Sequence, residues 1–142
     1  LLGYDEDEAG GFMTTAIVTA RADGTVGGLA ARLADHEDCP DELDAVILVD
    51  DDGAVVWDLP LLQLLVHPAD RALADLVGEA APVTVGIHDG VDVVAERLIE
   101  ARRPSVVVVD DAERPVGRIL ADDVIDALMP ERGRLHFPRL LQ

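Results

Sequence analysis

The stretch Val46-Ile47-Leu48-Val49-Asp50-Asp51 decides the fold, because it recurs 60 residues later as Val106-Val107-Val108-Val109-Asp110-Asp111. Each copy is a short apolar run that ends in paired aspartates, which is typical of a buried strand followed by a turn. A helical pattern precedes each copy, Val26 to Leu33 in the first and Val91 to Leu98 in the second. A unit of this length that is present twice favours a pseudo-symmetric pair over a solenoid.

Both copies are predicted to follow the order strand, helix, strand, strand, helix. The predicted elements are 17–20, 25–34, 45–49, 54–57 and 61–66 in the first copy, and 83–85, 91–101, 106–109, 116–120 and 122–128 in the second. This alternation indicates an α/β fold. The two halves are expected to bury their apolar faces against each other and to form one module.

The charge of the chain narrows the range of partners. Among its 142 residues, 29 are acidic and 11 basic, which gives a formal net charge of −18. Such a surface opposes binding to nucleic acid or acidic lipid, because both are negatively charged and bind to positively charged protein surfaces. Divalent cations are the natural partners. The competing interpretation is a solvated acidic surface that keeps the protein soluble or adapts it to high salt.

The chain is expected to be soluble and cytoplasmic. No apolar run approaches the roughly 20 residues that span a bilayer, and no signal peptide is visible. Cys39 is the only cysteine, so it makes no internal disulfide, which favours a reducing compartment. Leu1 stands where a complete chain would begin with methionine, which indicates a fragment of a longer protein.

The sequence does not indicate an enzyme. Ser105 is the only serine, and Cys39 has His36 nearby but no residue that would orient the histidine. No glycine-rich phosphate loop is present. His67 and His88 lie at the ends of predicted elements, where a solvated or capping histidine is the usual explanation.

The repeated unit resembles a tandem cystathionine-β-synthase-type (CBS) pair, or Bateman module. The stretch Val116-Gly117-Arg118-Ile119-Leu120-Ala121-Asp122-Asp123-Val124-Ile125 is similar to the family signature Gly-h-h-Thr-x-x-Asp-h-h, where h is hydrophobic. More narrowly, the stretch from Tyr4 to Thr14 resembles the segment Tyr-x-x-Asp-x-Ala-Gly-x-x-Met-Thr that leads into the CBS pair of MgtE-type magnesium transporters. We place an acidic lead-in at residues 1–12, repeat 1 at 13–68, repeat 2 at 69–129 and a basic tail at 130–142.

The resemblance implies a regulatory module that controls a magnesium transporter through Mg²⁺-dependent conformational change. In that family an acidic N-terminal helical domain precedes the CBS pair and a membrane pore follows it, which would make this chain the cytosolic part of an inner-membrane protein. The basic tail departs from the acidic helix that links CBS pair and pore in that family. The resemblance also implies a homodimer. Apolar helix faces from both copies are expected to form its interface, including Leu61, Leu64, Leu65, Val124 and Leu128.

Carboxylates are the candidate Mg²⁺ ligands, because Mg²⁺ prefers oxygen and is usually held by one or two carboxylates with several waters. The candidates are Asp5, Asp7, Glu8, Asp50, Asp51, Asp110, Asp111 and Asp126. Their spacing forms no preformed cage, so we expect shared surfaces with hydrated cations between them. The competing interpretation is that the aspartates after each buried strand only shape turns.

Adenine nucleotides are the alternative ligands, and the residues argue against them. The hydroxyl that holds phosphate in nucleotide-binding CBS pairs is replaced by Pro60 in the first copy and Leu120 in the second. Trp57 and Gln63 replace the glycine and the aspartate of the signature in the first copy. The second copy keeps Asp123, a candidate ribose contact that also suits a helix cap or first-turn charge. Arg102, Arg103 and Arg118 are the candidate phosphate contacts of that copy. A soluble nucleotide sensor and a dimerisation scaffold remain the alternative functions.

Overall fold

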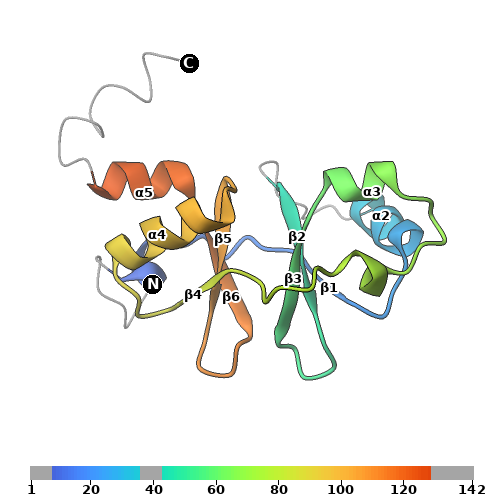
Figure 1. Ribbon diagram of the computed structural model, residues 1–142, viewed down its shortest axis with the longest axis horizontal. Helices are drawn as coiled ribbons and strands as arrows, with labels where there is room; N and C mark the ends of the chain where they lie inside the picture. Colours follow the sequence, from blue (N-terminus) through green and yellow to red (C-terminus); the bar gives the residue numbers. More distant parts are fainter. Residues whose placement is uncertain (1–7, 36–42, 129–142) are drawn as a thin grey trace, which may run out of the picture.

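The computed structural model describes residues 8–35 and 43–128, and it confirms the predicted order of elements in both copies (Figure 1). The first part contains α1 (Ala9–Phe12), β1 (Thr19–Arg21), α2 (Val26–Asp35), β2 (Ala45–Val49), β3 (Val55–Pro60) and α3 (Leu62–Val66). A 3-10 helix, η1 (Leu73–Leu76), follows. The second part contains β4 (Thr84–Gly86), α4 (Val91–Ala101), β5 (Ser105–Val109), β6 (Pro115–Leu120) and α5 (Ala121–Leu128).

The two sheets have the same topology and register. In the orders β1-β2-β3 and β4-β5-β6, the first pair of strands is parallel and the second antiparallel. Ile47 pairs with Asp58 in the first sheet, and Val107 pairs with Arg118 in the second. Each antiparallel pair carries an irregularity at the equivalent position, before Val49 and before Val109. The repeat seen in the sequence is therefore a repeat of structure, with an offset of 60 residues between the antiparallel strands.

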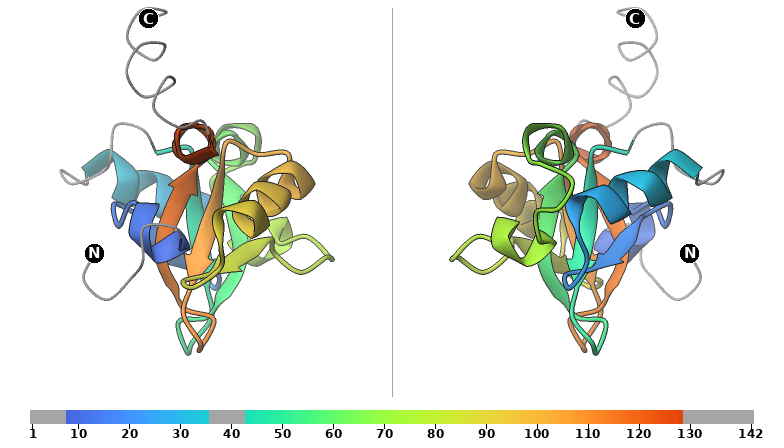
Figure 2. Two further views of the ribbon diagram at one scale, coloured as in Figure 1. Left: turned by 90° about the vertical axis from the view of Figure 1, so that its left-hand side faces the viewer. Right: turned by 90° about the vertical axis from the view of Figure 1, so that its right-hand side faces the viewer.

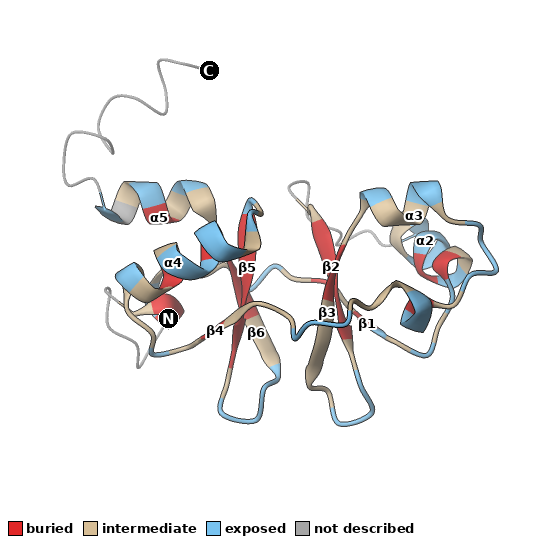
Figure 3. Ribbon diagram, in the orientation of Figure 1, coloured by how far each residue is buried: buried red, intermediate tan, exposed pale blue. Residues whose placement is uncertain are grey.

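The central strands are buried on both faces, which explains their continuous apolar sequences. Successive side chains of a strand point to opposite faces. Val46 and Leu48 pack into the core of repeat 1, whereas Ile47 packs with Val107 and Val109 in a cluster between the repeats. Figure 3 shows the buried strands of the two repeats facing each other in the middle of the molecule. The interface between the repeats is therefore a second core.

The aspartates after the buried strands form turns, as one of the two interpretations predicted. Asp50 Oδ1 accepts hydrogen bonds from the backbone N–H groups of Asp52 and Ala54, at 2.9 and 3.0 Å. Asp110 Oδ1 accepts from the equivalent groups of Ala112 and Arg114, at the same two distances. These bonds fix the hairpin turn in each repeat.

The lead-in contains a short helix, although glycine disfavours regular structure in general. α1 lies against repeat 2, although its sequence precedes repeat 1. Ala9 is fully buried in the core of repeat 2, and its N–H donates to the carbonyl of Asp89 at 2.8 Å. The N–H of Gly10 donates to Ile87 at 2.8 Å. The small residues allow this close approach, which sequence periodicity alone does not reveal.

Candidate functional site

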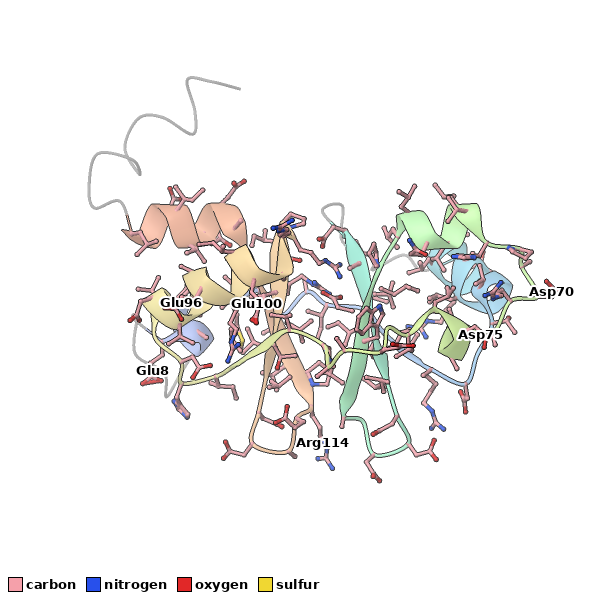
Figure 4. All side chains as sticks on the ribbon, in the orientation of Figure 1. Glu8, Asp70, Asp75, Glu96, Glu100 and Arg114 are labelled. Carbon is pink, nitrogen blue, oxygen red and sulfur yellow. The ribbon has the colours of Figure 1, made fainter. Side chains whose placement is uncertain are left out.

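The structure brings the two acidic turns together at one end of the molecule (Figures 1 and 2). The backbone N–H of Val55 donates to the carbonyl of Glu113 at 2.9 Å, and Arg114 Nε donates to the carbonyl of Asp52 at 3.1 Å. Figure 4 shows Arg114 beside these hairpin tips. We call this group the tip cluster. Its acidic members are Asp50, Asp51, Asp52, Asp110, Asp111 and Glu113.

A cavity of about 490 Å³ lies beside the turn of repeat 1. Its charged lining residues are Arg21, Asp23 and the aspartates at positions 50–52. Arg21 pairs with Asp23 at 3.1 Å and also contacts Asp51. The cavity lies at the carboxyl ends of the parallel strands β1 and β2, a frequent location for ligands in α/β sheets.

The tip cluster is not a preformed metal cage. Within residues 8–35 and 43–128, no group of three or more histidine, cysteine or acidic side chains is arranged to hold a metal ion. Oδ1 of both Asp50 and Asp110 is engaged by the turn. Asp51, Asp52 and Asp111 are exposed and present carboxylates to solvent. This arrangement suits hydrated cations that neutralise a surface.

The remaining predicted ligands lie elsewhere. Glu8 contacts Nδ1 of His88 in the loop before α4. Asp126 lies on α5, on the opposite side of the molecule from the hairpin tips (Figure 1). Asp5 and Asp7 are outside the described residues, as are His36, Cys39 and the basic tail. Of the six predicted metal ligands that the structure describes, only the four in the two turns are brought together.

A second cavity, of about 250 Å³, lies between the repeats. Trp57, Asp58, Glu100, Arg103 and Ser105 line it, together with residues 80–83. Trp57 packs against the connection between the repeats so closely that a Cβ on Gly78 would lie 2.4 Å from the ring. Trp57 departs from the nucleotide-binding signature in sequence and is a wall of this cavity in the structure. Asp123 is in the first turn of α5, as the helix-charge interpretation predicted, and is not among the residues that line the cavity.

Comparison with known proteins decides the family. The family model for the CBS domain matches residues 75–130, and repeat 1 has the same topology as that segment. Residues 75–130 belong to the CBS domain family, and the chain as a whole has the fold of a tandem CBS pair. It is also similar to the cytosolic domain of the Mg²⁺ channel MgtE solved in complex with ATP, with 29% identity, a TM-score of 0.80, and coverage of 87% of this chain and 50% of that one.

Other magnesium transporters are similar over the same region. The soluble part of a magnesium transporter has a TM-score of 0.81 at 28% identity, over 89% of this chain and 49% of that one. The magnesium transporters MgtE of Enterococcus faecalis and Thermus thermophilus are 29% and 30% identical to this CBS pair, and both matches cover 92% of the CBS pair. This CBS pair spans 29% of the length of each of these two relatives.

The CBS pair exposes apolar side chains on one helix of each repeat. Helices α3 and α5 lie on the same side of the molecule, opposite the hairpin tips (Figure 2). Their exposed apolar residues are Leu62, Leu65, Val66, Ile125 and Leu128, each at least 51% exposed. We call these residues the apolar helix face. None of the described helices is long and apolar enough to cross a membrane.

Three of the residues predicted for a dimer interface do not belong to this face. Leu61 and Leu64 are partly buried and pack on the core of repeat 1, and Val124 is 3% exposed in the core of repeat 2. The prediction was wrong for Val124, because α5 uses this apolar position to cover its own sheet. For Leu61 and Leu64, which are partly buried, it stays a prediction. Leu65 and Leu128 are exposed, as predicted.

A buried polar cluster between the repeats was missed by the sequence analysis. Arg118 makes a two-pronged ion pair with Asp58, with Nη1–Oδ2 and Nη2–Oδ1 distances of 2.8 and 2.7 Å. Arg118 also donates to Ser105 Oγ at 2.8 Å, and Ser105 donates to Asp44 at 3.0 Å. The available signal was a single charged residue at the same position of an apolar strand in both copies.

Proposed function

We propose that this CBS pair is a regulatory, non-catalytic module of a magnesium transporter and that Mg²⁺ bound at its acidic surfaces controls its conformation. The similarity to the cytosolic domain of MgtE supports this assignment. The observation that carries the cation proposal is the tip cluster, in which two acidic turns from different repeats lie side by side. The proposal places the module on the cytoplasmic side of a membrane, with a helical domain and a pore in the complete protein.

The tip cluster gives the proposal a physical basis. Two like charges 4 Å apart repel by about 1 kcal/mol in water and by about 4 kcal/mol at an effective dielectric constant near 20. Arg21 and Arg114 offset only part of the acidic charge there. Acidic surfaces of neighbouring domains or of a second copy would therefore repel this end until cations bind. Hydrated Mg²⁺ suits such a shared site because it keeps several of its waters.

Thermal unfolding with matched variants tests the cation proposal. Mg²⁺ at millimolar concentration should raise the melting temperature more than NaCl at equal ionic strength, since a ligand that binds only the folded state stabilises it by about 1.4 kcal/mol at ten times its Kd. Asp51→Asn/Asp111→Asn should remove most of the difference between the two salts. Asp70→Asn/Asp75→Asn removes the same charge far from the tips (Figure 4) and should retain it. Equal responses to both salts in the unaltered protein would refute the proposal.

The module is further proposed to form a homodimer through the apolar helix face. The face combines exposed residues of both repeats. Large exposed apolar side chains that gather on one side of a molecule are candidates for an interaction site. A two-fold arrangement would bury the same face of both copies. The alternative of a scaffold that only dimerises shares this interface but predicts no specific response to Mg²⁺.

An adenine-nucleotide sensor is the second candidate, because the cavity between the repeats offers an aromatic wall and Arg103, and one similar structure is a complex with ATP. Asp58 and Glu100 in the lining oppose a polyphosphate, as does the missing hydroxyl at Leu120.

Trp57 is the only tryptophan, so its fluorescence reports directly on the cavity. Titration with ATP, ADP, AMP and adenosine should leave the emission unchanged at micromolar concentrations. Micromolar affinity for any of them would put this candidate first. Binding of adenosine but not ATP, lost in Asp123→Ala, would assign Asp123 to ribose.

A further inference from the structure

The charges in the interface between the repeats are divided by repeat. Repeat 1 supplies two carboxylates, Asp44 and Asp58. Repeat 2 supplies Arg103, Arg118 and the hydroxyl of Ser105. Arg103 Nη1 donates to the carbonyl oxygen of Asp58 at 2.7 Å, and its Nη2 lies 3.5 Å from the Asp58 carboxylate. One side of the interface is therefore acidic and the other basic.

Asp58 and Arg118 occupy equivalent positions in the two repeats. Asp58 pairs with Ile47 on β2, and Arg118 pairs with Val107 on β5. Asp58 and Arg118 are 60 residues apart, as are their strand partners Ile47 and Val107. The pseudo-two-fold axis that relates the two repeats therefore also relates the Asp58 and Arg118 side chains. They are 8% and 4% exposed. A position near a symmetry axis meets its own equivalent, and here the two equivalents carry opposite charges.

The ion pair is poorly explained by stability alone. Ile47 and Val107 make its surroundings apolar, and taking two charges out of water there is costly. Arg118 Nε is buried and has no hydrogen-bond partner among the described residues. Replacing a buried ion pair with apolar residues is often neutral or stabilising. The cluster therefore needs another explanation.

We propose that the Asp58–Arg118 cluster is a recognition device that selects repeat 2 as the partner of repeat 1. If the same face of two repeats 1 met, Asp58 would face the Asp58 of the other copy, with the carboxylate of Asp44 in the same interface. If two repeats 2 met, Arg118 would face the Arg118 of the other copy, with Arg103 beside it. Both arrangements bury like charges without a counter-ion, whereas the apolar residues around them would tolerate either. Repulsion against the wrong partner is the usual way in which similar surfaces are kept from mispairing.

The double variant Asp58→Val/Arg118→Met tests the device in the full chain. It should unfold at a denaturant concentration equal to or higher than that of the unaltered protein. After refolding from denaturant, the fraction of protein in species larger than the native assembly should rise at least about tenfold, the ratio that corresponds to 1.4 kcal/mol of lost discrimination. Light scattering coupled to size-exclusion chromatography measures this fraction. Arg71→Met/Asp75→Val is the matched control, because it replaces an exposed ion pair of 3.5 Å with the same residue types. A stable double variant that refolds to the native size distribution would overturn the proposal.

Should the double variant fail to fold, a mixing experiment decides. Asp58→Arg places like charges in the interface of its own chain, and Arg118→Asp does the same with the opposite sign. Only pairing between the two chains restores Asp opposite Arg. Variants refolded together should therefore melt at a higher temperature than either variant refolded alone. A mixture that melts like its separate components would overturn the proposal.

Discussion

Asp58 and Arg118 are the clearest case in which single residues affect the stability of this protein. With Ser105, they are the buried polar or charged residues of the described chain. Removal of one partner of a buried ion pair leaves the other charge without its counter-ion, which is far more costly than loss of an exposed pair. The two kinds of pair occur here in one molecule, so they can be compared directly.

Arg118→Met alone should lower the free energy of unfolding by about 3–5 kcal/mol, because Asp58 would remain buried without its two-pronged partner. Arg97→Met is the matched control. Arg97 pairs with Glu100 at 3.2 Å on the surface of α4, and its loss should cost at most about 1 kcal/mol. Urea denaturation measures both values. Similar losses in the two variants would show that Arg103 suffices to neutralise Asp58.

The backbone conformation of the two hairpin turns allows a second prediction about single residues. Gly53 and Glu113 occupy equivalent positions with φ of 84° and 63°. Only glycine adopts this left-handed conformation without strain. Glu113→Gly should therefore stabilise the protein by up to about 1 kcal/mol, and Gly53→Ala should destabilise it by about 1 kcal/mol or more. Glu113→Ala, which removes the carboxylate but keeps a Cβ, separates the backbone effect from the charge effect in the same denaturation experiment.

At the scale of elements, the segment before each sheet packs on the other repeat. A Cβ on Gly117 of β6 would lie 2.4 Å from Met13 Sδ and 2.8 Å from the carbonyl oxygen of Thr14. Backbone hydrogen bonds of 2.8 and 2.9 Å join Thr14 and Arg118 in both directions. In repeat 1 the equivalent position is Trp57, which packs on Gly78. In repeat 2 the strand supplies the small residue, Gly117, and the lead-in supplies the large one, Met13. In repeat 1 the strand supplies the large residue, Trp57, and the connection supplies the small one, Gly78.

Gly117→Ala should destabilise the protein by about 1–3 kcal/mol, the usual cost of overpacking, because backbone as well as side-chain atoms of the lead-in must shift. Gly28→Ala provides the contrast. Gly28 lies within α2, where the nearest atom to an added Cβ is the Thr25 hydroxyl at 3.2 Å, and alanine there should stabilise the helix by up to about 1 kcal/mol. Thermal unfolding of both variants gives the sign of each effect. A stable Gly117→Ala would mean that the lead-in packs less closely on β6.

The apolar helix face carries the prediction for assembly. Leu65→Glu/Ile125→Glu should convert the proposed dimer into a monomer at micromolar concentration while the fold persists, because Leu65 is 81% exposed and Ile125 51% exposed. Ile99→Glu is the matched control on α4, since Ile99 is 75% exposed but outside the face. Sedimentation velocity distinguishes the two species. If the unaltered protein sediments as a monomer at every concentration and Mg²⁺ level, the dimer proposal fails.

At the scale of the whole molecule, a net charge of −18 on 142 residues affects every equilibrium of the protein. Self-repulsion of this size destabilises a compact state, and salt screens it, since the Debye length falls from about 30 Å at 0.01 M to about 8 Å at 0.15 M ionic strength. The melting temperature should therefore rise with NaCl across this range. The same series of NaCl concentrations should raise the melting temperature of Asp70→Asn/Asp75→Asn by a smaller amount. A melting temperature independent of NaCl would show that local ion pairs already offset the charge.

The sequence determined the repeated order of elements, because strand and helix periodicities and turn-forming aspartates are local properties. The strand 45–49 and the helix 91–101 were predicted with the bounds that the structure shows. The turns after both buried strands were also predicted, since Asp50 and Asp110 act through their own backbone neighbours. The doubled pattern of buried strand and aspartate turn, together with the signature of the second copy, was enough to indicate a CBS pair.

Only the tertiary structure decided which residues meet across the repeats. Periodicity identifies the apolar positions of α3 and α5 but does not say which of them cover their own sheet, so Val124 was assigned to the wrong surface. Asp58 and Arg118 are 60 residues apart, and each is an isolated charge in its own strand. Their pairing, like the meeting of the two acidic turns, depends on the packing of one sheet against the other, which is a long-range property that no local pattern encodes.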